Sequence, residues 1–271
     1  MACAPTVEEL NAQFEDIQEE ITADPLISPS VDQFGDDCRI AQNLKDNHML
    51  YAKLVSLWTS SDKMYSGIRY IRGDGNCFYR SASFGIHEAL LRDRALASEF
   101  LKRVKDLSSR LTNDYGSAVE DFCDYALDLF ERLASGTCST VEELHRAFYW
   151  RKLLKYVLYF YRYAVSNYIR AHSDEFLPFV VGLGYDTLQA FCYSEVEALG
   201  SESDHLQLVA FAQCFGVRIT VEYLDCSEVE SATRHTFPGV EKSINGTSDN
   251  VNDVVEVTLL YRPGHYDLLY K

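Results

Sequence analysis

The segments with β-strand character all lie near the C-terminal end of the chain, after a long region of helical character. Residues 217–225 (VRITVEYLD) are rich in β-branched side chains, and residues 254–261 (VVEVTLLY) and 265–270 (HYDLLY) flank an Arg-Pro-Gly turn. Two such runs around a short turn predict a β-hairpin. Because helices precede these strands instead of alternating with them, the sequence predicts an α+β fold, with a small, mostly antiparallel sheet between helical layers.

The region before the strands has apolar residues at helical spacing in several segments. The first of them is expected to break near Gly85, and the last is stopped by Gly216. The aromatic run at 152–169 has apolar side chains on several faces, as in a buried helix. A polar stretch at 226–252 predicts a long exposed loop. The predicted helices span residues 76–104, 118–134, 140–171 and 204–216.

The N-terminal part of the chain has a separate amphipathic pattern. A helix is predicted over residues 6–21, and the Pro-, Ser-, Asp- and Gly-rich residues 25–43 predict a linker or loosely packed segment. This helix either packs on the main body or becomes ordered only against a partner. The sequence thus predicts an arm and linker over residues 1–43 and a catalytic domain over 44–271. The apolar stripe of the arm consists of Val7, Leu10, Phe14, Ile17 and Ile21.

Charge and cysteine content limit the possible partners. The net charge of −16 argues against nucleic-acid binding and favours partners with a basic surface. The first residues do not resemble a signal peptide, and no apolar run is long enough to span a membrane. We therefore expect a cytosolic or nuclear monomer without disulfides. None of the eight cysteines forms a CxxC pair, so no metal or cofactor is predicted.

The decapeptide IRGDGNCFYR at residues 71–80 places one cysteine between a turn and a helix. Asp74-Gly75-Asn76 is typical of a tight turn, so Cys77 is expected at or next to a helix N-terminus. There, the helix macrodipole and unpaired backbone N–H groups favour the nucleophilic thiolate. The N–H groups of the loop at Asp74 are suited to a developing oxyanion. Taken alone, this turn still leaves a buried, inert cysteine as the better interpretation.

A second segment, PGHYD at residues 263–267, supplies what an activated thiol needs. His265 and Asp267 are two apart on a predicted strand, so their side chains leave the same face. The carboxylate can fix the imidazole tautomer and leave the other ring nitrogen for a thiol. Considered alone, such a pair is more often a surface feature of a hairpin. Together with Cys77, it indicates the Cys–His–acid arrangement of a thiol hydrolase.

The remaining histidines have no such context in the sequence. His205 stands at a predicted helix start, where Ser201 or Ser203 could cap the helix. An ordinary cap-region histidine is the simpler interpretation. The alternative places Glu202 and His205 near the catalytic cleft, where they modulate His265. We expect a structural role for His87 and surface positions for His48, His145, His172 and His235.

Three strings of this chain, IRGDGNCFYR, ESDHLQLVAFAQ with VRITVEYLD, and LLYRPGHYDLLYK, resemble the otubains. These are a branch of the ovarian-tumour (OTU) cysteine proteases that remove ubiquitin, and the likeness runs from about residue 7 to the C-terminus. The resemblance implies a papain-like site geometry, with Cys77 as nucleophile, His265 as general base and acid, and Asp267 as orienting acid. It also implies an oxyanion hole formed by the backbone at Asp74 and Cys77.

The resemblance extends to the arm, whose apolar stripe is similar to the otubain segment that contacts the proximal ubiquitin. Tyr266 is a further candidate contact with ubiquitin. The arm and the aspartate at 267 resemble the first otubain type, which implies a preference for proteasome-targeting ubiquitin chains. The alternative function implied is non-catalytic: binding and inhibition of ubiquitin-charged conjugating enzymes through the arm. The polar stretch at 226–252 is longer than expected for the family.

Overall fold

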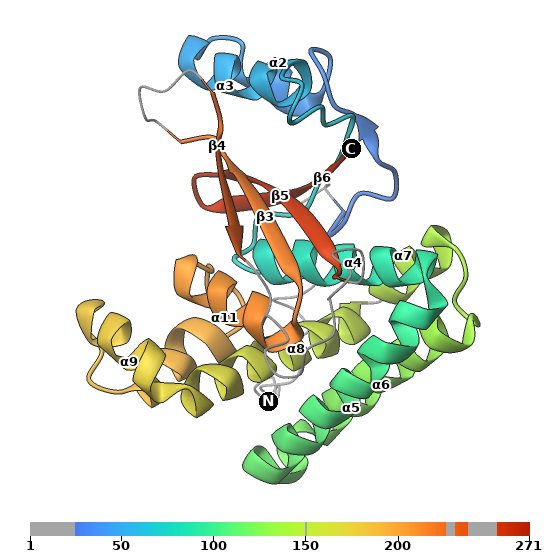
Figure 1. Cartoon of the computed structure of the whole chain (residues 1–271), viewed down its shortest axis with the longest axis vertical. Coiled ribbons are helices and arrows are strands. Elements are labelled where there is room, and N and C mark those ends of the chain that lie inside the picture. The colour runs from blue at the N-terminus through green and yellow to red at the C-terminus, as the bar shows by residue number, and fades with distance from the viewer. Residues whose placement is uncertain (1–24, 150, 226–230, 238–253) are drawn as a thin grey trace, which may run out of the picture.

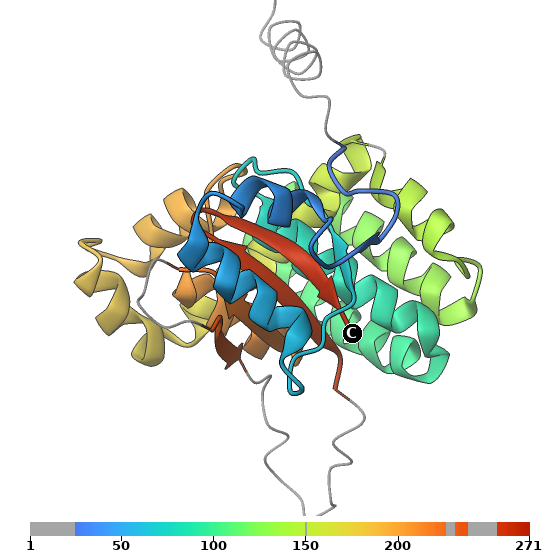
Figure 2. The ribbon, with the colours of Figure 1, turned by 90° about the horizontal axis from the view of Figure 1, so that it is seen from above.

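The computed structural model describes residues 25–149, 151–225, 231–237 and 254–271. Two short helices, α2 (Arg39–Leu44) and α3 (His48–Thr59), cover one face of a six-stranded sheet, and α4 (Cys77–Arg92) packs against the other (Figure 1). Seen from above, α2 and α3 lie in front of the sheet and the other helices behind it (Figure 2). The predicted arrangement of a sheet between helical layers is confirmed.

The sheet is mixed, with one parallel pair. Its order is β1-β2-β6-β5-β3-β4, in which β3 and β5 run parallel and the other neighbours are antiparallel. The predicted C-terminal hairpin is present, since Arg262 pairs with His265 around Pro263-Gly264. The strands are β1 (Asp32–Gln33), β2 (Gly67–Arg69), β3 (Arg218–Tyr223), β4 (Thr233–Phe237), β5 (Glu256–Arg262) and β6 (His265–Tyr270).

The helices behind the sheet are arranged around α8, which contacts α4, α6, α7 and α11. The structure confirms the helical segments predicted downstream of residue 118, and α11 ends at Gly216, whose φ is +59°. These helices are α5 (Arg94–Tyr115), α6 (Glu120–Ser135), α7 (Val141–Tyr149), α8 (Arg151–Ala171), α9 (Ser173–Gly182), α10 (Leu188–Phe191) and α11 (His205–Phe215), with a 3₁₀ turn, η1 (Gly116–Val119), and a π-helical turn, η2 (Cys192–Glu197).

Two apolar cores lie on the two sides of the sheet. Successive side chains of β6 point to opposite faces of the sheet, so this strand contributes residues to both cores. Tyr266 and Leu268 join the large core formed with α4, α8 and α11, while Leu269 joins the smaller core under α2 and α3. Asp267 points to the same side as Leu269, yet it is fully buried and polar. The sheet therefore places one ionisable side chain inside the molecule at the end of the hairpin.

The predicted break near Gly85 is wrong, because α4 runs without interruption to Arg92. A Cβ at position 85 would lie 2.7 Å from a methyl of Val257 on β5 and 3.1 Å from one of Leu268 on β6. This glycine therefore lets the helix pack closely on the sheet. The chain turns only at Asp93, whose carboxylate accepts hydrogen bonds from the first backbone N–H groups of α5.

Two further expectations are corrected. Residues 25–43 are not loosely packed, since Phe34, Cys38 and Ile40 are buried against the sheet. Part of the expected loop at 226–252 is the strand β4, which pairs with β3 along its whole length. In both places a mostly polar composition hid a few apolar side chains that reach the core.

The predicted helix at 6–21 lies outside the described residues, and the domain boundary at residue 43 stays a prediction.

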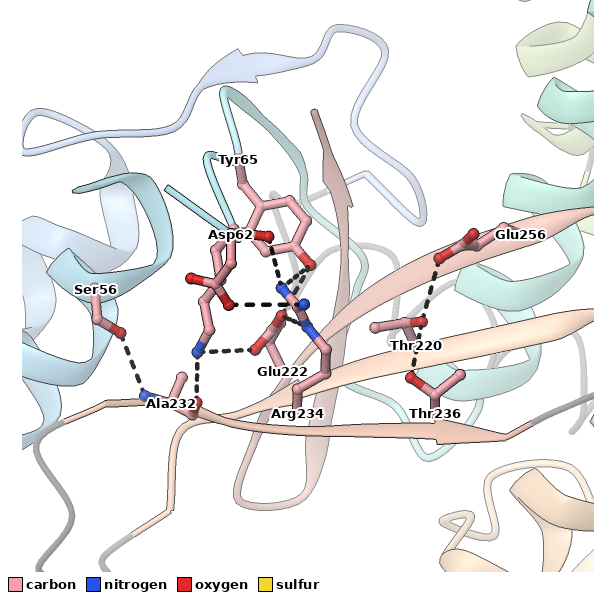
Figure 3. A network of polar contacts seen from close by, with 10 residues as sticks. Ser56, Asp62, Tyr65, Thr220, Glu222, Ala232, Arg234, Thr236 and Glu256 are labelled. Atoms are coloured by element: carbon pink, nitrogen blue, oxygen red, sulfur yellow. Dashed lines mark hydrogen bonds and ion pairs between the residues drawn. The ribbon is translucent and has the colours of Figure 1, made fainter. Parts of the chain in front are cut away.

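A buried polar network joins β3, β4 and the turn before β2 (Figure 3). Glu222 on β3 is fully buried and accepts hydrogen bonds from the Tyr65 hydroxyl at 2.9 Å and from Arg234 Nε at 2.6 Å. Lys63 Nζ lies 3.4 Å from the other carboxylate oxygen and donates to the Ala232 carbonyl at 2.5 Å. These contacts pair the buried charge and fix the edge strand β4 to the body of the protein.

Candidate active site

Cys77 is the first residue of α4, as the turn chemistry of its neighbours predicts. Its side chain is 3% exposed, so only a narrow approach to the sulfur remains. Asn76 is the N-cap residue, but its side chain makes no capping hydrogen bond. The backbone N–H groups of the first turn therefore lack the usual side-chain acceptor. These N–H groups are available to an anionic group beside the sulfur. The helix itself is held in place by its packing on β5 and β6.

His265 and Asp267 make the contact that their spacing predicts. The distance from His265 Nε2 to Asp267 Oδ1 is 3.0 Å, and the same oxygen accepts a hydrogen bond from the Ile71 N–H at 2.9 Å. Arg262 donates to Oδ2 at 2.7 Å. Both carboxylate oxygens thus have partners, which makes a fully buried Asp267 compatible with a negative charge. Arg262 and the Ile71 N–H were not predicted from the sequence.

The charges of this pair are set by mutual contact. Burial alone lowers the pKa of His265, but its hydrogen bonds to Asp267 and Cys77, and their negative charges, raise the pKa to about 9. Burial alone raises the pKa of Asp267, but the hydrogen bond from His265 and the charge of Arg262 lower it overall. The imidazole is therefore held as imidazolium beside an ionised carboxylate at neutral pH.

The orientation of the ring places the thiol and the carboxylate on different nitrogens. Nε2 faces Asp267, so Nδ1 is the nitrogen available for the Cys77 sulfur. A Cβ at position 73 would lie 3.1 Å from Nδ1, so Gly73 leaves room for the ring. Segments 71–77 and 265–267, far apart in the sequence, thus meet at one point. An imidazolium between a cysteine sulfur and a carboxylate stabilises the thiolate and can support nucleophilic catalysis.

The loop before Cys77 has a fixed conformation. Arg80 on α4 donates to Asp74 Oδ1 at 3.0 Å and to Oδ2 at 2.6 Å, a two-pronged ion pair. Gly75 has a φ of +75°, and a Cβ there would lie 1.8 Å from the carbonyl oxygen of Gly200. The Asp74 side chain therefore holds the turn in place, and only glycine fits at position 75. An oxyanion-binding role for the backbone at Asp74 stays a prediction.

Arg162, which lies behind this loop on α8, was not predicted from the sequence as a site residue. Its guanidinium is fully buried and donates to the Gly75 carbonyl at 3.2 Å and to Asn76 Oδ1 at 2.9 Å. One signal was present: an arginine inside the aromatic run at 152–169, which was predicted to be buried. A buried arginine needs hydrogen-bond acceptors, so this position indicated a polar site within the core.

The other predicted site residues differ in burial and in their neighbours. Tyr266 is 3% exposed and packs on Phe78, so it offers almost no surface to a partner, and its assignment to ubiquitin binding stays a prediction. Glu202 is exposed, and its carboxylate lies 3.5 Å from where a Cβ of Gly264 would be, next to His265. His205 is exposed and meets the Phe237 ring edge-on.

The cap of α11 is Asp204, and not Ser201 or Ser203 as expected. The modulating roles of Glu202 and His205 stay predictions. His87, expected to be structural, is fully buried with Nδ1 2.7 Å from the Ser83 carbonyl, and burial lowers its pKa to about 4. The arm residues Val7, Leu10, Phe14, Ile17 and Ile21 lie outside the described residues.

An open groove of about 480 Å³ adjoins His265 on the side of the N-terminal segment. Its lining includes Arg39, Arg72 and Arg262 and one carboxylate, Asp32, so cationic side chains predominate there in a strongly acidic chain. Of these, Arg262 is ion-paired with Asp267. Within the described ranges, no cluster of three His, Cys, Asp or Glu side chains is suited to hold a metal ion. In the same part of the chain, no helix combines the length and apolar character that a bilayer span requires.

Comparison with known proteins assigns the chain to a family. Residues 19–271 match the family model of the Peptidase C65 otubains. Human ubiquitin thioesterase OTUB1 is 35% identical over an alignment of 283 residues, gaps included. The alignment covers 99% of this chain and 92% of that protein. The ubiquitin thioesterase otubain-like protein of Caenorhabditis briggsae is 33% identical over 265 residues, covering 96% of this chain and 85% of the relative.

Solved structures agree with this assignment. A complex of ceOTUB1 with ubiquitin aldehyde and UBC13~Ub superposes with a TM-score of 0.77 at 28% identity, covering 96% of this chain and 98% of that one. A complex of h/ceOTUB1 with ubiquitin aldehyde and UBCH5B~Ub gives a TM-score of 0.77 at 30% identity, with 97% of each chain covered. By sequence and by fold, the chain belongs to the otubain family of peptidases, Peptidase C65.

Proposed function

We propose that this otubain-family peptidase hydrolyses the isopeptide bond between the C-terminal glycine of ubiquitin and a lysine side chain, with Cys77, His265 and Asp267 as its catalytic triad. The class of enzyme, a deubiquitinating cysteine protease, follows from the family. The observation that carries the triad is the position of His265. Its Nε2 lies 3.0 Å from Asp267 Oδ1, and its pKa is raised by Asp267 and by Cys77 beside it. Asp267 and Arg262 keep this ring oriented.

In the proposed mechanism, the Cys77 thiolate attacks the scissile carbonyl and forms a C–S bond. The resulting oxyanion is stabilised by backbone N–H groups of the loop at Asp74 and of Cys77. The His265 imidazolium then protonates the departing lysine nitrogen as the C–N bond breaks, which leaves a thioester. Neutral His265 next takes a proton from a water molecule as the water oxygen forms a bond to the thioester carbonyl carbon. The C–S bond then breaks, which restores the Cys77 thiolate beside the His265 imidazolium and releases the ubiquitin C-terminus, which loses its remaining proton to solvent as a carboxylate.

Cleavage of linkage-defined di-ubiquitin under reducing conditions tests this proposal. Wild-type protein should release mono-ubiquitin, and Cys77→Ala should leave all chains intact. We further propose that proteasome-targeting chains are preferred and that the arm at 7–21 contacts the proximal ubiquitin. Deleting residues 1–24 should then reduce this preference across the linkage panel. Intact chains with the wild type would reject the activity, and an unchanged preference after the deletion would reject the role of the arm.

A ubiquitin probe with a C-terminal electrophile tests the nucleophile separately. Burial raises the pKa of the thiols of Cys123, Cys138, Cys192 and Cys214, to about 11 for Cys123 and about 12 for Cys214. These thiols therefore remain protonated at neutral pH and react slowly. Mass spectrometry of the adduct should find the probe on Cys77, with no adduct formed by Cys77→Ala. Modification at another cysteine would reject Cys77 as the nucleophile.

A second candidate function is non-catalytic inhibition of ubiquitin-charged conjugating enzymes. It is favoured by the two superposed complexes, whose relatives are bound to UBC13~Ub and UBCH5B~Ub. We expect Cys77→Ser to block chain synthesis by such an enzyme as well as wild type does, and deletion of residues 1–25 to abolish the block. If the truncated protein inhibits equally well, the arm has no part in this function.

A further inference from the structure

Arg162 is a fully buried arginine in the middle of α8, directly behind the loop that precedes Cys77. One terminal nitrogen donates to the carbonyls of Gly75 and Ser201 at 3.2 and 2.8 Å and to Asn76 Oδ1 at 2.9 Å. The other donates to the Val196 carbonyl at 2.8 Å. A single guanidinium therefore holds two segments that are far apart in the sequence, the turn at 74–76 and the loop at 196–201.

These two segments also contact each other directly. Asn76 Oδ1 accepts a hydrogen bond from the Gly200 N–H at 2.9 Å, in addition to the one from Arg162. Gly75 lies so close to the Gly200 carbonyl that even a methyl group would overlap with it. Asn76 thus uses its side-chain oxygen inside the protein instead of capping α4. The conformation of the turn before Cys77 depends on this contact and on the arginine behind it.

Arg162 is held by hydrogen bonds to neutral groups, while the charges of Asp74 and Cys77 act on it from nearby. Its hydrogen-bond acceptors are backbone carbonyls and an amide, and among the described residues no carboxylate is ion-paired with it. Its guanidinium also stacks 4.4 Å from the centre of the Tyr79 ring. Burial disfavours this cation in the resting protein and lowers the pKa of Arg162. The cation becomes favourable when negative charge develops nearby, as it does beside Cys77 in the proposed mechanism.

We propose that Arg162 is a positioning residue for the oxyanion-binding loop: it fixes the backbone of residues 75–76 through Asn76 and the loop at 196–201, and it offsets the negative charge that forms at the Cys77 adduct. This inference rests on the proposed function. It predicts that Arg162 matters for steps that form an oxyanion and has little effect on reactions of the Cys77 sulfur that form none.

Three measurements on the full chain separate these steps. The first is kcat and KM for a ubiquitin substrate, and the second is inhibition by ubiquitin aldehyde, whose adduct with Cys77 carries an oxyanion. The third is alkylation of Cys77 by iodoacetamide, which displaces iodide and forms no oxyanion. For Arg162→Lys, we expect kcat and aldehyde affinity to fall about 10²-fold. KM and the alkylation rate should stay within about threefold of the wild-type values.

Arg103→Lys is the matched control. Arg103 also donates to a backbone carbonyl, that of Phe215, from a half-buried position, and this hydrogen bond does not involve the loop before Cys77. It should resemble wild type in all three measurements, and an equal loss of kcat in this control would overturn the inference. So would wild-type kcat and aldehyde affinity in Arg162→Lys. A parallel fall of aldehyde affinity and alkylation rate would also overturn it, since it would indicate general disruption of the site.

Asn76→Ala provides a second route if Arg162→Lys does not fold. It removes the oxygen shared by Arg162 and Gly200, so it should lower kcat and aldehyde affinity and spare alkylation. In the double variant, the two effects should be less than additive, because both act on one loop. Unchanged kcat in Asn76→Ala would overturn the inference. Failure of the wild type to cleave ubiquitin or bind the aldehyde would instead reject the proposed function.

Discussion

At the level of single residues, the charge of His265 is set by its neighbours. Its pKa rises from 6.5 to about 9 because the hydrogen bonds and charges of Asp267 and Cys77 outweigh the effect of burial. A raised pKa means that folding favours the protonated form. This contribution to stability is complete below pH 6.5 and is lost as the pH rises through about 9. The raised pKa also means that the His265 ring keeps a proton to donate until the pH approaches about 9.

The first prediction concerns Asp267→Asn. We expect kcat/KM of the wild type to fall as the pH rises through about 9, where the imidazolium that protonates the leaving amine is lost. Without the carboxylate, this decline should move toward neutral pH by about one unit or more, with kcat reduced at least about 10²-fold. pH–rate profiles measure both effects. Asp128→Asn, at an exposed position, is the control, and an unmoved alkaline limb in Asp267→Asn would contradict the role of the carboxylate.

The second prediction concerns the glycine in the turn before Cys77. Gly75→Ala combines a φ of +75° with a Cβ 1.8 Å from the Gly200 carbonyl, so we expect a loss of at least about 2 kcal/mol in the free energy of unfolding and loss of most activity. Gly182→Ala, where a Cβ meets no atom within 4 Å, should be neutral or slightly stabilising. Urea unfolding and kcat measure the pair. Equal behaviour of the two variants would show that the turn tolerates side chains.

At the scale of secondary structure, the edge strand β4 depends on polar contacts more than on apolar ones. Three of its five residues are exposed, and Phe237 at its end is buried. Arg234 connects the strand to Glu222 (Figure 3). The other carboxylate oxygen of Glu222 lies 3.4 Å from Lys63 Nζ. The ion-pair network thus joins β4 to β3 and to the turn before β2. Removing its central carboxylate leaves Lys63 buried without its negative partner.

The third prediction follows from this network. Glu222→Ala should lower the free energy of unfolding by about 3–5 kcal/mol, because it leaves a buried cation unpaired. Glu256→Ala on the neighbouring strand β5 is the control. Its carboxylate is 47% exposed and lies 3.6 Å from Arg218, so the expected change is below about 1 kcal/mol. Denaturant unfolding measures the free energy of unfolding of both variants. If the two values differ by less than the error of the fit, Glu222 does not stabilise the fold through its buried ion pairs.

For the molecule as a whole, the distribution of charge bears on how a substrate approaches. The chain carries a net charge of −16, yet the groove beside His265 contains three arginines. A strongly negative chain attracts partners with a basic surface over long range, so we expect its charge to favour the encounter with a ubiquitin substrate. This attraction acts before the chemical step and is screened by salt.

The fourth prediction is therefore a dependence on ionic strength. Raising NaCl from about 25 to 500 mM should lower kcat/KM for a ubiquitin substrate several-fold, through KM, with kcat nearly constant. Alkylation of Cys77 by uncharged iodoacetamide should not change over the same range. Steady-state kinetics at each salt concentration provide the measurement. A kcat/KM that is flat or rises with salt would show that the overall charge does not guide substrate binding.

Predictions from the sequence were most successful where the signal is local. The turn at Asp74–Asn76, the helix that starts at Cys77 and the hairpin carrying His265 and Asp267 were predicted because each depends on residues that are neighbours in the chain. The residue types then predicted the site, because a cysteine, a histidine and an aspartate together are typical of a thiol hydrolase.

Features that depend on contacts between distant segments were missed. Gly85 was expected to break a helix, whereas its lack of a side chain lets α4 approach Val257 and Leu268. β4 was expected to be loop, because its pairing with β3 and its ion pairs come from elsewhere in the chain.

The sequence by itself determined the catalytic candidates and the strands β3, β5 and β6, because these follow from local turn chemistry, periodicity and residue type. It did not predict β1 and β2, which precede most of the helices although strands were expected only near the C-terminal end. Only the tertiary structure decided which groups surround those candidates. Arg262 on Asp267, and Arg162 behind the turn at 75–76, are brought there by packing of β5 and α8. Hydrogen bonds and charges act over a few ångströms in space, and their strength depends on burial, which residue spacing along the chain does not encode.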